Sequence, residues 1–388
     1  MKRISEIKNS IYSVGVNARD VELFEGQFFV PLGMSYNSYV VRDNVNFVFD
    51  TVDAAFADEW ISNLQTVLGK EKPDYLVVQH MEPDHSGSIG KFFEVYPETK
   101  IVGNAKTFAM LDQFFGKDIA KNRIVVVDGQ TIESENHAFT FVFAPFVHWP
   151  EVMLTYDAKT KTLFSADAFG KFGAVDFDDE WTCEARRYYF GIVGKYGMQV
   201  QNLLKKATDL EIETICPLHG PVLTDNIDYY IDKYKVWSNY DVESEGVVIA
   251  YASVYGNTEK AVDYLKDKLT EYGCEKVVIQ NLARTDIHEA IEDAFRYGKL
   301  VLASITYNGD IFPSMRSFIE GLIERGYKKR TIATIENGSW APTANKVMKN
   351  AFANSKDIVF TENNVTIRSA MTDENKRVLD ALAKELLQ

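Results

Sequence analysis

The chain has 388 residues, of which 46% are hydrophobic and 25% are charged, a composition ordinary for a soluble globular protein. One hydrophobic core rarely serves a chain of this length, so we expect two domains. The 42 basic and 56 acidic residues give a net charge of −14. A field of that sign repels nucleic acid and anionic membranes, so we expect neither as a partner.

No segment of the sequence predicts a signal peptide or a membrane span, because no apolar run approaches about 18 residues. We therefore expect a cytoplasmic protein. The three cysteines, Cys183, Cys216 and Cys274, form no CxxC pair. Their spacing argues against a disulfide framework and against cysteine-bound iron or zinc. We expect all three to be small buried side chains.

The first part of the chain predicts short strands at uneven spacing. Strands are expected at Phe28–Val30, Tyr39–Arg42, Asn46–Asp50, Asp74–Gln79, His137–Phe146, Val152–Tyr156, Lys161–Ser165 and Ile212–Cys216, and a helix at Ile89–Val95. The polar residues 157–160 separate two of these strands and predict a hairpin.

After the polar segment Tyr240–Gly246 the pattern becomes a regular alternation of strand and helix. Strands are expected at Val247–Ala252, Lys276–Gln280, Leu300–Ser304 and Thr331–Ile335, and helices at Glu259–Tyr272, Asp286–Tyr297, Pro313–Arg325 and Thr372–Leu387. This alternation predicts a doubly wound parallel sheet with helices on both faces. We place the domain boundary between residues 245 and 246.

The clearest chemical signal is the sequence QHMEPDH, which follows a predicted strand and holds His80, Glu82, Asp84 and His85. Residues of ligand type also follow three later strands: His148, Asp167 and His219. Loops at strand ends can direct several side chains into one pocket, so the set predicts a two-metal site. The remaining histidines, His137 and His288, lie in a polar turn and near a helix start, and we expect both to be exposed to solvent.

In order and spacing, these residues resemble the metallo-β-lactamase pattern, in which HxHxDH precedes a later His, Asp and His. The resemblance covers about residues 30–245. Glu82 stands where the hydrolases have their second histidine, and a carboxylate suits harder, redox-active iron better than zinc. The sequence HxExDH therefore resembles the flavodiiron proteins.

This resemblance implies the ligand set. His80, Glu82 and His148 would hold the iron nearer the flavin, Asp84, His85 and His219 would hold the other, and Asp167 would bridge them. Ligation by His85 is left open, because the family allows water in its place.

A second site is predicted after the strand Val247–Ala252, where a loop with hydroxyl groups and a glycine precedes a helix. The N-terminus of a helix offers N–H groups and a positive dipole end to a phosphate. The chain has neither GKS nor GKT here, nor GxGxxG, which argues against a nucleoside triphosphate and a dinucleotide. Two later loops also follow strands, and ligands of doubly wound sheets bind beyond the carboxyl ends of the strands.

The residues expected around this ligand are Ser253, Val254, Tyr255, Gly256, Asn257, Thr258, Thr306, Tyr307, Asn308, Gly309, Asn337, Gly338, Ser339 and Trp340. Residues 246–388 resemble flavodoxin, which implies FMN as the ligand, with Tyr307 and Trp340 beside its ring. The implied fold class is α/β: an N-terminal αββα metallo-β-lactamase-like sandwich followed by a flavodoxin-like parallel sheet.

The resemblance implies an oxidoreductase that reduces O₂ to water, NO to N₂O, or both. Electrons would reach the diiron centre through FMN from a separate donor, such as rubredoxin or a reduced deazaflavin. A head-to-tail homodimer is implied, with a tetramer as the alternative. We single out Tyr196, from a tyrosine-rich stretch, as a catalytic hydroxyl of the pocket.

Two other functions are compatible with the same residues. One is a zinc hydrolase fused to a flavodoxin-like module, against which Glu82 argues. The other is an FMN electron carrier with a vestigial metal site, against which the complete set of seven ligand residues argues.

Overall fold

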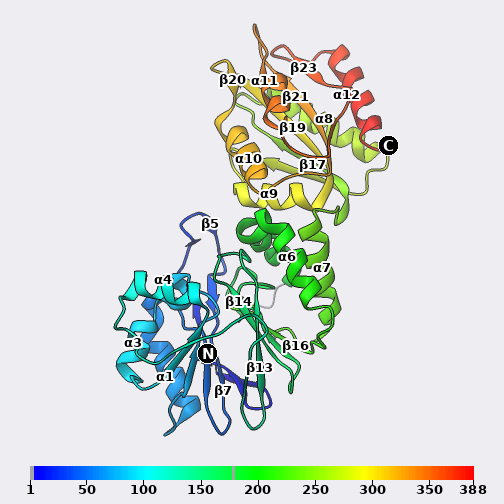
Figure 1. The fold of residues 1–388 in the computed structure, drawn as a ribbon. Coiled ribbons are helices and arrows are strands. Elements are labelled where there is room, and N and C mark those ends of the chain that lie inside the picture. Colours follow the sequence, from blue (N-terminus) through cyan, green and yellow to red (C-terminus); the bar gives the residue numbers. More distant parts are fainter. Residues whose placement is uncertain (1–3, 177–179) are drawn as a thin grey trace. The chain divides into compact units, whose positions relative to one another are not determined.

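The structure is a computed structural model that describes residues 4–176 and 180–388 and has two compact units, divided between residues 235 and 236 (Figure 1). Among the described residues, no helix is both long and apolar enough to cross a membrane.

The first unit is built on two sheets with strand orders β1-β2-β7-β8-β9-β10-β11 and β12-β13-β14-β15-β16. The strands of the first sheet are β1 (Ser5–Lys8), β2 (Ile11–Ser13), β7 (Tyr39–Val41), β8 (Phe47–Phe49), β9 (Tyr75–Val77), β10 (Lys100–Gly103) and β11 (Arg123–Val125). Those of the second are β12 (Thr131–Glu133), β13 (Ala138–Phe143), β14 (Met153–Asp157), β15 (Thr162–Phe164) and β16 (Thr214–Cys216). Two short ribbons accompany them: β3 (Val16–Ala18) with β6 (Met34–Tyr36), and β4 (Leu23–Phe24) with β5 (Phe28–Phe29).

Aromatic side chains fill the space between the two sheets. The ring of Phe49 stacks on that of Phe164 with centroids 4.1 Å apart, and Phe47 meets Phe139 edge to face at 4.8 Å. All four belong to one buried cluster. Residues two positions apart on a strand, such as Phe47 and Phe49, share a face of the sheet, because successive side chains point to opposite faces. This packing fixes one sheet against the other and with it the loops at their ends.

Helices cover the outer face of each sheet (Figure 1). The helices α1 (Ala57–Leu68), α3 (Ile89–Val95) and α4 (Ala105–Phe115) bury Trp60, Phe92 and Phe108 in one core with strand residues of the first sheet. Side chains of α6 (Gly197–Lys206) and α7 (Ile227–Asn239) face those of the second sheet. The predicted αββα sandwich is confirmed.

The second unit holds a parallel sheet in the order β18-β17-β19-β21-β22, with β23 beside β21. Its strands are β17 (Ser244–Tyr251), β18 (Val277–Asn281), β19 (Tyr297–Tyr307), β20 (Asp310–Ile311), β21 (Arg330–Asn337), β22 (Ile358–Phe360) and β23 (Val365–Ile367). Its helices are α8 (Asn257–Glu271), α9 (Ile287–Arg296), α10 (Pro313–Glu324), α11 (Ala344–Ala351) and α12 (Asp373–Glu385). Counted from β17, this is the 2-1-3-4-5 order of flavodoxin, so the predicted doubly wound sheet is confirmed.

Several local expectations are wrong. Only 1% of His137 is exposed, because it donates through Nδ1 to the buried carboxylate of Asp157, 2.6 Å away. His288 is also largely covered, with its Nδ1 3.1 Å from Asp286. Cys183 is exposed, whereas Cys216 is buried and Cys274 is intermediate. Charge pairing and side-chain direction decide whether these residues are buried, and a local sequence pattern shows neither.

Residues 236–245, at the start of the second unit, offer a test of the predicted domain boundary. The guanidinium of Arg330, which is 2% exposed, donates to the carbonyl oxygens of Tyr240 and Asp241 at 2.7 and 3.3 Å. Trp237 is buried and donates to Glu243 at 2.6 Å. Residues 236–245 therefore satisfy polar groups of the second unit, and the boundary at 245/246 stays a prediction.

We predict that the fragment 246–388 is less stable than the fragment 236–388 by about 1–3 kcal/mol, because the shorter one leaves the Arg330 guanidinium without two acceptors. Urea unfolding of both fragments measures the difference. Arg330→Gln should destabilise the longer fragment more than the shorter one. Equal stabilities would place the boundary at 245/246.

Candidate functional site

The loop after β9 carries four of the seven residues predicted to hold metal. His80 and Glu82 lie in the loop itself, and Asp84 and His85 belong to the short helix α2 (Pro83–Ser86) that follows. The buried carboxylate of Asp50, at the end of β8, accepts from the backbone N–H groups of Gln79 and His80 at 2.7 and 3.2 Å. This contact fixes the start of the loop against the neighbouring strand.

Three other strand ends supply the remaining residues. His148 lies between β13 and β14, Asp167 follows β15, and His219 follows β16. The loop around Asp167 is tight, with left-handed backbone at Ala166 (φ 49°) and Phe169 (φ 66°). Its conformation is held by bonds such as that from the Leu218 N–H to the Ala166 carbonyl, at 2.8 Å.

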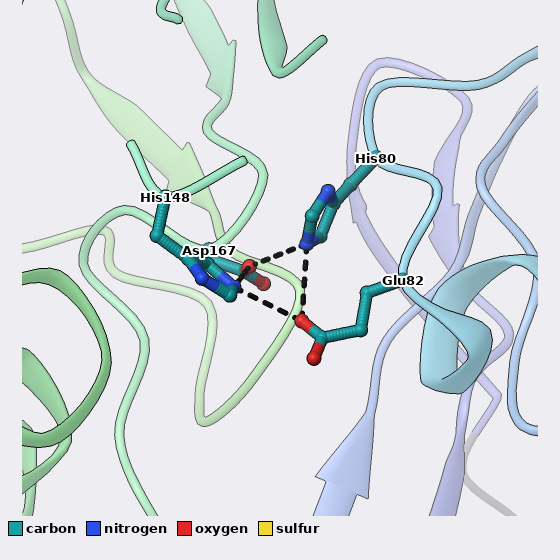
Figure 2. Close-up of side chains that lie close together, drawn as sticks. All are labelled: His80, Glu82, His148 and Asp167. Carbon is teal, nitrogen blue, oxygen red and sulfur yellow. Dashed lines mark hydrogen bonds and ion pairs between the residues drawn. The ribbon is translucent and has the colours of Figure 1, made fainter. Parts of the chain in front are cut away.

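Figure 2 shows the first group, in which Glu82 and Asp167 lie between two imidazoles. The Oε2 atom of Glu82 is 3.2 Å from Nε2 of His80 and 2.9 Å from Nε2 of His148. The Oδ2 atom of Asp167 is 3.1 and 3.2 Å from the same nitrogens. All four ligand atoms lie within 4.8 Å of one another, which suits a single ion with bonds of about 2.0–2.2 Å.

The second group consists of Asp84, His85 and His219. Nε2 of His85 and Nε2 of His219 are 2.9 Å apart, and Oδ2 of Asp84 lies 3.3 and 3.2 Å from them. The Oδ1 atom of Asp167 is 3.7 Å from both nitrogens. One oxygen of Asp167 therefore faces each group, which is the geometry required of a bridging carboxylate. The structure brings together all seven predicted residues.

The donor set fits metal ions better than it fits a hydrogen-bonded network. Both oxygens of Asp167 and of Asp84 are buried and accept no well-directed hydrogen bond from the described residues, although imidazole nitrogens lie nearby. Two imidazole Nε2 atoms at 2.9 Å also leave room for one proton at most between them. A cation at each group would satisfy these atoms, because buried charges are normally paired or bound to metal.

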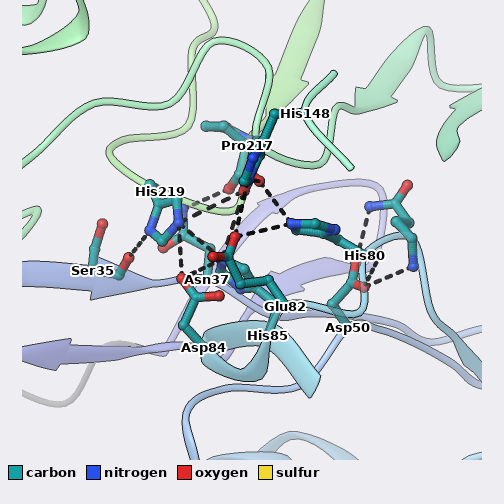
Figure 3. A network of polar contacts seen from close by, with 12 residues as sticks. Ser35, Asn37, Asp50, His80, Glu82, Asp84, His85, His148, Pro217 and His219 are labelled. Atoms are coloured by element: carbon teal, nitrogen blue, oxygen red, sulfur yellow. Dashed lines mark hydrogen bonds and ion pairs between the residues drawn. The ribbon is translucent and has the colours of Figure 1, made fainter. Parts of the chain in front are cut away.

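The second ring nitrogens of His80 and His219 donate hydrogen bonds to the protein, as Figure 3 shows for His219. The Nδ1 of His219 donates to the Ser35 carbonyl oxygen at 2.7 Å. The Nδ1 of His80 donates to Oε1 of Glu151 at 2.8 Å, a residue that the sequence analysis missed. These bonds direct the Nε2 lone pairs of both rings toward the ion positions.

Aromatic and acidic residues surround the ligands. The ring of Trp149 lies 5.4 Å from that of His80, and the ring of Tyr188 lies 5.4 Å from that of His219. Tyr196 stacks on Phe146 at 5.6 Å, and its catalytic role stays a prediction. Glu25, missed because it lies far away in sequence, has a pKa raised to about 7 by partial desolvation and by the nearby Glu82 carboxylate.

The second candidate site is a cavity of about 620 Å³ beyond the carboxyl ends of β17, β19 and β21. It lies where the strand order reverses, between β17 and β19. Of the residues predicted to line it, all but Gly256 do so: Ser253, Val254, Tyr255, Asn257, Thr258, Thr306, Tyr307, Asn308, Gly309, Asn337, Gly338, Ser339 and Trp340. Ile305, Ala341 and Ser369 complete the lining. Their side chains carry no signal that distinguishes them from ordinary strand-end residues.

The start of α8 has the features of a phosphate site. Gly256 precedes the helix in left-handed conformation (φ 81°), and the helix has no side-chain N-cap. The Thr258 hydroxyl is buried without a hydrogen-bond partner among the described residues. A phosphate at the N-terminus of this helix would accept hydrogen bonds from that hydroxyl and from the first backbone N–H groups of the helix. The residues therefore fit the phosphate end of FMN.

Comparisons with known proteins agree with both sites. The model of the ODP family beta lactamase matches residues 34–220, and the model of the flavodoxin domain matches residues 248–363. An uncharacterised protein of Methanocaldococcus jannaschii is 30% identical over 99% of this chain and 98% of its own length. The nitric oxide reductase of Moorella thermoacetica is 29% identical over 93% of this chain and 92% of its own length. The crystal structure of the flavodiiron protein from Giardia intestinalis has a TM-score of 0.92 and 25% identity, and the match covers 99% of this chain and 97% of that one.

The chain belongs to the flavodiiron protein family.

In this flavodiiron protein the ligand cluster itself predicts a pH dependence of stability. Burial alone would lower the pKa of His148, but the carboxylates of Asp167 and Glu82 outweigh burial and raise it to about 9. The pKa values of His80 and His85 are raised as well, against burial, by Asp167 and Asp84 respectively. The folded metal-free site therefore keeps protons that the unfolded chain loses near pH 6.5.

We predict that the metal-free protein loses stability as the pH rises from about 6.5 through 9, by about 1.4 kcal/mol per pH unit for each retained proton. Thermal unfolding in a chelator between pH 6.5 and 9.5 measures the slope. His148→Asn should reduce it. A melting temperature that is constant or rises over this range would contradict the protonation pattern.

Proposed function

We propose that this flavodiiron protein reduces O₂ to water, NO to N₂O, or both, at a non-haem diiron centre, with electrons supplied through FMN. The observation that carries the proposal is Asp167, whose two oxygens each face one of two ligand groups in a chain that also has a flavodoxin-like unit. The relative from Moorella thermoacetica, named a nitric oxide reductase, supports the same chemistry.

The electron count explains why both sites occur in one chain. Reduction of O₂ to two waters takes four electrons and four protons, and joining two NO molecules as N₂O takes two electrons and two protons and releases one water. When bound, two ferrous ions and reduced FMN together supply four electrons. Complete reduction without release of partly reduced oxygen thus requires both the diiron centre and FMN.

The protein's own residues hold and shield the site. His80, Glu82 and His148 would bind one iron, and Asp84, His85 and His219 would bind the other, with Asp167 between them. The ring of Trp149, 5.4 Å from that of His80, restricts water at the first group. An apolar surrounding of this kind admits a small uncharged gas and strengthens the charge interactions within the site.

We also propose a head-to-tail homodimer in the cytoplasm, in which the flavin of one protomer meets the diiron centre of its partner. Support comes from large exposed side chains at the flavin cavity and on the first unit. Tyr255 and Trp340 at the flavin cavity are 91% and 89% exposed, and Phe29 and Phe146 on the first unit are 49% and 41% exposed. Surfaces of this kind favour burial in an interface, and two-fold symmetry would bury two pairs at once.

The first test is anaerobic reduction of protein with measured iron and FMN content, followed by separate additions of O₂ and NO. We predict that the rate of gas consumption and the iron affinity of Asp167→Ala both fall by more than about 100-fold. Loss of a residue that only hydrogen-bonds to a metal ligand already costs about 10- to 100-fold. Asp157→Asn, a buried carboxylate in the same unit, is the matched control.

Loaded wild-type protein that consumes neither gas would refute the proposed reaction. Bound zinc with hydrolase activity would favour the rival enzyme. Separate mixing experiments with reduced rubredoxin and with a reduced deazaflavin would identify the electron donor.

For the dimer, we predict that the double variant Tyr255→Ser, Trp340→Ser raises the dissociation constant at least about tenfold. A single hot-spot aromatic contributes about 2 kcal/mol or more, and about 1.4 kcal/mol corresponds to tenfold. Sedimentation at several concentrations measures it, at matched FMN content. A Val359→Ser variant, also exposed but on β22, is the control. A fully active wild-type monomer would exclude the proposed arrangement.

A further inference from the structure

The histidines of the two ligand groups differ in what holds their second nitrogen. His80 donates from Nδ1 to a carboxylate, Oε1 of Glu151, at 2.8 Å. His219 donates from Nδ1 to a neutral acceptor, the Ser35 carbonyl oxygen, at 2.7 Å. The Nδ1 of His85 is buried and has no hydrogen-bond partner among the described residues. Only the first group therefore has an imidazole backed by a negative charge.

Without Glu151 the two groups would carry equal charge. The first contains Glu82, the second contains Asp84, and Asp167 faces both. Asp50 is the other buried carboxylate nearby, but its oxygens accept from the backbone of residues 79 and 80 and from the Gln79 side chain rather than from a ring. Glu151 is thus the buried charge that makes the two groups unequal, and the exposed carboxyl of Glu25 lies near Glu82 of the same first group.

The hydrogen bonds of Glu151 do not require a charged side chain. Its Oε1 accepts both from His80 and from the Met81 N–H, each at 2.8 Å, whereas its buried Oε2 has no partner among the described residues. A glutamine would make the same two bonds through its Oε1 and would avoid the cost of burying a charge. The presence of a carboxylate with no exposed surface points to a role for the charge itself.

We propose that Glu151 is a positioning residue that makes the ion held by His80, Glu82 and His148 the more readily oxidised of the pair. An imidazole that donates to a carboxylate is a stronger electron donor at its other nitrogen, and a nearby buried negative charge favours the higher charge of a ferric ion. In half-oxidised protein the ferric ion occupies this position. The inference rests on the proposed function, because it takes both ions to be iron.

The deciding variant is Glu151→Gln in the full-length protein loaded with FMN and ⁵⁷Fe. We expect its ferric–ferrous equilibrium at the first group to shift toward ferrous at least tenfold, which is about 59 mV for one electron. Iron affinity should fall by about 10- to 100-fold. A redox titration followed by electron paramagnetic resonance measures the shift, and Mössbauer spectra should show one of two iron signals altered.

The chain offers a matched control, because His137 and Asp157 form the same kind of buried pair, with Nδ1 and Oδ2 2.6 Å apart. Asp157→Asn removes an equivalent charge in the same unit and should leave the potential and both iron signals unchanged. Glu151→Asp keeps the charge and should keep the order of oxidation. Thermal unfolding of each metal-free variant reports whether the fold is intact.

Two results would overturn the inference. One is a Glu151→Gln protein that binds two irons with unaltered potential and spectra. The other is an equal shift in Asp157→Asn, which would attribute the effect to a general loosening of the unit. A wild-type protein that binds no iron would refute the proposed function and this inference together. A wild-type protein that binds iron, together with a Glu151→Gln variant whose potentials are unchanged, would refute the inference alone.

Discussion

Burial of the Asp167 carboxylate is the constraint on which the first unit depends. A buried carboxylate is costly unless opposite charge surrounds it, and here four imidazoles lie within 3.1–3.7 Å of its two oxygens. Those imidazoles come from three different loops. The loops meet only because the aromatic layer between the sheets, with Phe49 stacked on Phe164, fixes the strand ends that carry them. A cation at each group completes the balance of charge that the fold imposes.

In the second unit, too, the ends of strands position the site, but its phosphate end lacks charged side chains among the described residues. Parallel strands direct the loops after β17, β19 and β21 to one edge, where the reversal of strand order opens a crevice. Backbone N–H groups and hydroxyls, rather than charged side chains, line its phosphate end. An anionic cofactor can bind there without a buried cation, so the unit needs no charged ligand cluster of its own.

The two ligand groups look alike in sequence but differ in their surroundings. Each has one carboxylate of its own and shares Asp167, while Glu151 lies behind His80 and a carbonyl lies behind His219. In a site that passes electrons one at a time, such inequality decides which ion changes charge first. The burial that makes these charges costly also makes them effective over a few ångströms.

The sequence by itself determined the ligand types, their order and the doubly wound sheet of the second unit, because HxExDH and the later strand-end residues are local signals and the alternation after residue 246 is periodic. The αββα fold of the first unit was implied by the resemblance that HxExDH carries. It also predicted the helix Ile89–Val95 with its observed bounds. It did not reveal Glu151, Asp50 or the burial of His137. Each of these depends on a partner 20 or more residues away, such as Asp157 for His137 and His80 for Glu151. Only the tertiary structure decides such pairs, since the cost of burying a charge depends on what the fold places beside it.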